Sequence, residues 1–83
     1  MTTLKIFKHL DNYVICDKDG IICRFSSFNE LYNQVNAYAK EREFNFFIDK
    51  SISAEEKRSL DRMILKITEI YFDKKPDDET RVL

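Results

Sequence analysis

A single apolar segment, Ser53 to Lys74, constrains what this chain can fold into more than any other stretch. Its apolar residues recur at helical spacing, and neither Gly nor Pro interrupts them. Ser53 stands three residues before Glu56, the spacing at which the serine hydroxyl accepts from the glutamate N–H while the glutamate side chain reaches back. Pro76 then ends the pattern. We therefore predict a long helix over 53–74.

The predicted helix is apolar on more of its circumference than a helix that packs on one side only. Most of its apolar residues share one arc: Leu60, Met63, Ile64, Ile67, Ile70 and Tyr71. Leu65 and Phe72 lie on a flank outside that arc, so apolar residues cover about 220° in all, against about 100° for an ordinary surface helix. Either the rest of the chain or a partner must cover this flank, and we expect a partner.

A predicted strand and a predicted hairpin come before the first predicted helix. Residues 3–8 alternate, with Leu4 and Ile6 on one side. Residues 13–25 are typical of a hairpin, because two β-branched and aromatic runs flank Asp19-Gly20, a preferred pair for a two-residue turn. In that register Cys16 faces Cys23 and Val14 faces Phe25, on the side that also holds Ile21 and meets the core. The opposite side is predicted to be half-exposed and carries Tyr13, Ile15, Asp17, Ile22 and Arg24.

The remaining segments complete a small α+β fold. Ser27 and Glu30 have capping-box spacing at the start of an amphipathic helix predicted over 26–43. Residues 44–50 alternate and favour a fourth strand, with a continuation of the preceding helix as the alternative. The order β-β-β-α-β-α predicts a two-layer sandwich, in which an antiparallel meander carries both helices on one face. A right-handed crossover can lay the fourth strand parallel to the first.

Chain length, net charge and composition limit the classes of function that this chain can have. The 83 residues suit one domain, predicted to span 1–75, with a flexible charged C-terminal tail over 76–83. A net charge of −1 provides no basic field that would attract nucleic acid. No apolar run is long enough for a signal peptide or a membrane span, so a cytoplasmic location is expected. The abundance of Asn, Lys, Ile and Phe is reminiscent, in composition alone, of small accessory proteins of phages and mobile elements.

No group of residues has the spacing of a catalytic or metal site. His9 is the only histidine and falls in a predicted turn, where nothing activates it as a general base. Cys16 and Cys23 are too few for a zinc site and are expected to be reduced and buried. We therefore expect no enzyme activity, no metal and no cofactor.

The surplus of apolar surface favours a protein-binding module that regulates or inhibits a protein partner. The predicted protein-binding residues are Leu65, Phe72, Tyr13, Ile15 and Ile22. A homodimer is also expected, in which two copies of the long helix pack antiparallel across a twofold axis. The alternative is a protein that binds RNA or single-stranded nucleic acid on the open face of its sheet. Its contact residues would be Lys5, Phe7, Lys8, Tyr13 and Arg24.

Overall fold

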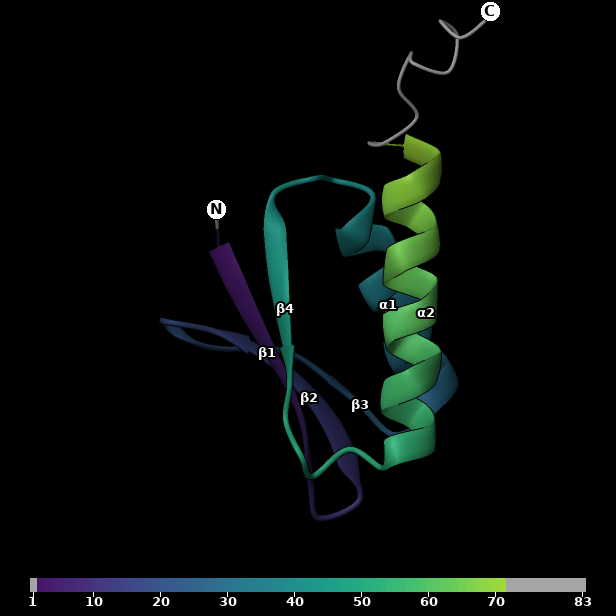
Figure 1. Cartoon of the computed structure of the whole chain (residues 1–83). Coiled ribbons are helices and arrows are strands. Elements are labelled where there is room, and N and C mark those ends of the chain that lie inside the picture. Colours follow the sequence, from purple (N-terminus) through teal and green to yellow (C-terminus); the bar gives the residue numbers. More distant parts are fainter. Residues whose placement is uncertain (1, 72–83) are drawn as a thin grey trace, which may run out of the picture.

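The computed structural model describes residues 2–71 and confirms the two-layer α+β architecture (Figure 1). Its elements, in chain order, are β1 (Thr2–His9), β2 (Asn12–Asp17), β3 (Gly20–Phe25), α1 (Phe28–Ala39), β4 (Phe44–Ile48) and α2 (Ala54–Tyr71). Phe72 and the predicted tail over 76–83 lie outside the described residues. No helix in the described part of the chain is long and apolar enough to cross a membrane.

The four strands form one mixed sheet in the order β3-β2-β1-β4. The first three make the predicted antiparallel meander, and β4 pairs parallel to β1. Parallel neighbours need a long crossover connection, which α1 provides. Both helices cover the same face of the sheet, and the other face carries no helix among residues 2–71 (Figure 1).

The core lies between the helices and one face of the sheet. Leu4 and Ile6 are buried on β1, as their alternation predicted. Leu31, Val35 and Ala39 recur at helical spacing on α1 and fill the layer above them. The other buried members of this cluster are Tyr13, Ile15, Ile52, Leu60, Met63 and Ile67.

Both helices begin with the predicted serine cap. The Ser27 hydroxyl accepts from the Glu30 N–H at 3.3 Å, and the Ser53 hydroxyl accepts from the Glu56 N–H at 3.1 Å. The Glu56 carboxylate accepts a hydrogen bond from the Tyr13 hydroxyl on β2, a partner that the capping box did not predict. This bond ties the start of α2 to the sheet.

The register predicted for the β2–β3 hairpin is wrong. Asp17 pairs with Gly20, so Lys18-Asp19 is the turn, and a bulge follows between Ile15 and Cys16. A type I′ turn requires a positive φ at both turn residues, but neither Lys18 nor Asp19, both among the described residues, has one. The positive φ is that of Gly20, at 137°, just after the turn. The Asp17 side chain accepts from the Asp19 N–H at 2.8 Å and fixes this turn.

The new register reverses the faces of β2. Ile15 pairs with Cys23, and Tyr13 pairs with Phe25. The side chains of Tyr13 and Ile15 are therefore buried under the helices, where Cys16 and Val14 had been predicted. A one-residue shift of register moves every side chain of a strand to the opposite face, which explains the whole error.

Candidate functional site

Two of the five predicted protein-binding residues are not available to a partner. Tyr13 is 6% exposed and Ile15 is fully buried, both in the core cluster. Ile22 and Leu65 are exposed as predicted, on β3 and α2 respectively. Phe72 lies outside the described residues. The exposed pair does not form one surface, because Ile22 belongs to one edge of the sheet and Leu65 to the helix layer.

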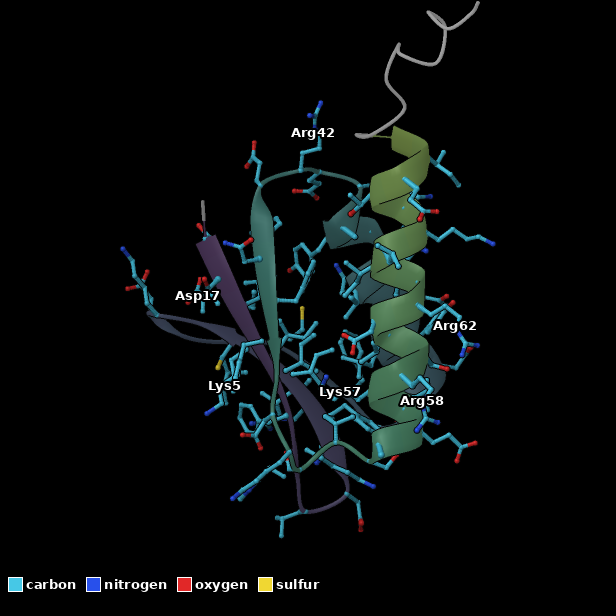
Figure 2. All side chains as sticks on the ribbon, in the orientation of Figure 1. Lys5, Asp17, Arg42, Lys57, Arg58 and Arg62 are labelled. Carbon is cyan, nitrogen blue, oxygen red and sulfur yellow. The ribbon has the colours of Figure 1, made fainter. Side chains whose placement is uncertain are left out.

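The open face of the sheet brings together three of the five residues predicted to contact nucleic acid. Lys5 and Phe7 lie two positions apart on β1, and Phe7 shares a cross-strand row with Arg24 through β2. Lys8 instead lies on the helix side, with its ammonium 5.2 Å from the centre of the buried Tyr13 ring. Figure 2 shows Lys5 on the side of the sheet away from the helices.

A hollow of about 480 Å³ opens on this uncovered face, and we refer to it as the sheet-face hollow. Its lining comes from all three strands of the meander and the β1–β2 turn: Phe7, His9, Leu10, Asn12, Val14, Ile21 and Arg24. Val14 is only 3% exposed although it lies outside the core cluster, so it forms the floor of the hollow. Leu10 and Ile21 are 80% and 55% exposed and stand at its rim.

Leu10 has a backbone conformation that leucine rarely adopts. It is the first residue of the two-residue turn between His9 and Asn12, and its φ is 58°. A side chain in this left-handed region costs about 1–2 kcal/mol, which is why glycine is usual at such positions. The strain is not offset by burial, since the side chain projects into solvent beside the hollow.

Four cations among residues 2–71 lie on two different sides of the molecule. Lys5 and Arg24 flank the apolar residues of the open sheet face. Arg58 and Arg62 project from α2 on the opposite side of the molecule (Figure 2). The Lys5 ammonium lies 5.5 Å from the centre of the Phe7 ring, within cation–π distance. The open face therefore presents an apolar centre with two positive charges around it.

A second depression, the β4–α2 groove, separates the edge strand from the long helix and has a volume of about 320 Å³. It is lined by Phe44, Asn45, Phe46, Asp61, Ile64, Leu65 and Thr68. Leu65 is 58% exposed, so the flank predicted to be unusual is indeed uncovered by residues 2–71. Ile70 is also exposed, at 53%, although it was predicted to belong to the buried arc.

Two tyrosines on the helix side have hydroxyl groups with perturbed acidity. Burial, together with the hydrogen bond to Glu56, raises the pKa of Tyr13 above its usual value of 10.0. Burial also raises the pKa of Tyr38, whose hydroxyl lies 3.7 Å from the Cys23 sulfur. Both groups stay neutral at physiological pH, so they act as structural hydrogen-bonding groups.

The thiols and the histidine do not converge. Cys16 lies on the open face and Cys23 on the helix side, because Cys23 pairs with Ile15. Both are free and half-buried, which corrects the prediction that they share the core face. His9 is exposed at the end of β1. Within residues 2–71 no group of His, Cys, Asp and Glu side chains could hold a metal ion.

Comparisons with protein-family models, with curated protein sequences and with solved structures find no match for this chain. The geometry of its surfaces must therefore carry any functional argument. The sequence indicated neither the sheet-face hollow, which depends on the register of the β2–β3 hairpin, nor the strained Leu10, which lies in the turn between β1 and β2. The stretch Asp17-Lys18-Asp19-Gly20 correctly indicated a hairpin, but it did not indicate which two of these residues form the turn.

Proposed function

We propose that this protein is a non-enzymatic binding module that regulates or inhibits a protein partner by occupying one of that protein's surfaces. The observation that carries the proposal is the sheet-face hollow, an apolar depression on the uncovered side of the sheet. Large exposed apolar side chains grouped on one face mark protein interaction sites more often than isolated ones do. Leu10 and Ile21 are such side chains, and both stand at the rim of the hollow.

The chemistry of the face indicates what kind of segment it would bind. An aliphatic or aromatic side chain of the partner would enter the hollow over Val14, where it loses contact with water. Lys5 and Arg24 would meet acidic groups on either side of that anchor. The strain at Leu10 supports the same assignment, because a costly backbone conformation that presents an exposed apolar side chain is typical of functional sites.

Single-stranded nucleic acid is the second candidate, and it would use the same face. Phe7 with the adjacent Lys5 and Arg24 forms a small set of one aromatic and two basic side chains of the kind that stacks bases and contacts phosphates. It ranks second because Arg58 and Arg62 of α2 lie on the far side of the molecule, where a strand crossing the sheet would not meet them (Figure 2).

Photo-crosslinking from the rim of the hollow tests the proposal and separates the two candidates. A photoreactive amino acid replaces Leu10, or, as the matched control, Lys66 on the exposed side of α2. We expect a protein adduct from position 10 only, insensitive to nuclease and competed by the unmodified chain. The same adduct should be lost when Ile21→Lys places a charge at the rim.

A nuclease-sensitive adduct from position 10 would instead favour nucleic acid. Its salt dependence would then be steep, since each phosphate contact releases counterions. Equal adducts from positions 10 and 66, or none from either in lysates of cells that produce the protein, would contradict the proposal.

A further inference from the structure

The strand β4 forms one edge of the sheet, and no strand among residues 2–71 pairs with its outer side. Its other side is hydrogen-bonded to β1. The Asp49 N–H donates to the Ile6 carbonyl at 2.8 Å, and the Glu43 carbonyl accepts from the Thr2 N–H at 3.1 Å. Backbone groups alternate in direction along a strand, so odd-numbered positions face β1 and even-numbered positions face outward. The outward residues are Phe44, Phe46 and Ile48.

This edge lacks the features that normally prevent strands from pairing between molecules. Residues Phe44–Ile48 contain no charge, no proline and no bulge. The opposite edge of the same sheet differs, because β3 carries Arg24 and its pairing with β2 is interrupted by an irregularity. The unprotected edge is therefore specific to β4.

We propose that β4 pairs antiparallel with β4 of a second copy of this chain, which makes one continuous sheet across a twofold axis. The axis passes at Phe46, which pairs with its own counterpart, while Phe44 of one copy lies opposite Ile48 of the other. In this register all three outward-facing residues form mutual hydrogen-bonded pairs. A shift by two residues in either direction leaves one of them without a partner inside the strand, so the centred register makes the most bonds.

The side chains next to the edge fit the same arrangement. Phe44, Phe46 and Ile48 face the helix layer but remain half-buried, because the β4–α2 groove lies beside them. A second copy seated on the edge would cover that groove. The same axis brings the two α2 helices alongside one another in antiparallel directions, with the exposed Leu65 of each near the junction.

The pairing has one electrostatic cost. Glu43 of one copy would lie opposite Asp49 of the other at each end of the paired strands, and salt screens such exposed like charges. The interface is separate from the sheet-face hollow. If the chain proves monomeric, the proposed binding site at the hollow is unaffected. If no partner binds the hollow, the proposed dimer is unaffected.

Charge placement on the open face of β4 tests the register. In the proposed dimer Asn45 of each copy lies opposite Phe47 of the other, and both side chains are exposed. The variant Asn45→Lys/Phe47→Lys puts like charges opposite each other, and Asn45→Lys/Phe47→Asp puts opposite charges there. Sedimentation equilibrium measures the dimer dissociation constant, and circular dichroism checks that each variant is folded.

We expect the parent to be a dimer and the dissociation constant of the like-charge variant to exceed that of the opposite-charge variant by about tenfold. Registers shifted by two residues would place identical positions opposite each other, and position 45 or 47 opposite Asp49 or Glu43, so the opposite-charge variant would then dimerise no more tightly than the like-charge variant. Leu65→Asp should also weaken the dimer while the chain stays folded, because Leu65 is exposed in the monomer. A monomeric parent at millimolar concentration, or two charge variants that dimerise equally, would overturn the inference.

Discussion

The hydroxyl of Tyr13 on β2 donates a 2.8 Å hydrogen bond to a carboxylate oxygen of Glu56 near the start of α2. The Tyr13 ring is buried and makes a T-shaped contact with the Phe28 ring, with ring centres 5.9 Å apart. One residue therefore links the sheet, the first turn of α1 and the first turns of α2. Its apolar body and its polar tip have different partners, as is usual for buried tyrosines.

Removal of this hydroxyl should destabilise the fold without changing its shape. We expect Tyr13→Phe to lower the free energy of unfolding by about 1–2 kcal/mol, since a hydrogen bond to a charged group is lost while the ring stays packed. Urea denaturation measures the change. Tyr32→Phe is the matched control, because Tyr32 packs its ring on Phe28 and its hydroxyl makes no hydrogen bond to any residue of 2–71. An equal loss in both variants would contradict the assignment.

The same tyrosine should make the stability fall at alkaline pH. Its pKa in the folded state lies above 10.0 because burial and Glu56 disfavour the phenolate. The unfolded chain therefore releases this proton first, so stability is full below pH 10.0 and is lost as the pH rises through the folded pKa. Urea titrations between neutral pH and pH values above 10.0 should show a shallower decline for Tyr13→Phe than for the parent.

Leu10→Gly should stabilise the protein although it removes a large side chain. Relief of the left-handed strain stabilises the folded state by about 1–2 kcal/mol. Glycine also gives the unfolded chain more conformational freedom, which cancels about half of that gain. We therefore expect the free energy of unfolding to rise by about 0.5–1 kcal/mol. Asp11→Gly is the control, since Asp11 has a negative φ and gains nothing from glycine. If Leu10 contacts a partner, the more stable variant also binds that partner less well. A thermal midpoint that does not rise would show that the turn carries little strain.

The two thiols should react at different rates. Cys16 lies on the open face of the sheet opposite Lys5, whereas Cys23 lies under α1 beside Tyr38. We expect Cys23→Ser, which retains Cys16, to react with a thiol reagent several times faster than Cys16→Ser. Oxidation should give no disulfide within the chain, because the two side chains point to opposite faces of the sheet. Equal rates in the two variants would contradict this placement.

The fold was largely predictable from the sequence because its elements are strongly patterned. Leu31, Val35 and Ala39 repeat at helical spacing, and Ser27 and Ser53 stand at the two helix starts where the structure has them. The position of β4 followed from topology, since a parallel neighbour of β1 is what a crossover through α1 produces. These features are local or follow from general rules of chain connection.

The candidate site was less predictable because it depends on a single turn. The position of Gly20 after the turn, rather than inside it, decides whether Tyr13 or Val14 faces the helices. Both choices give an apolar core face, so the hydrophobic pattern does not distinguish them. Leu65 was predictable, since its exposure follows from helical periodicity alone.

The parallel pairing of β1 with β4 also sets the order in which the chain can fold. The meander from Thr2 to Phe25 joins neighbours through two-residue turns, so it closes small loops. The pairing of Thr2 with Phe44 closes a loop of about 40 residues, which costs more chain entropy than closing either turn of the meander. We therefore expect β4 to be the last strand to join the sheet. On a ribosome, the meander can assemble before the segment that completes it has been synthesised.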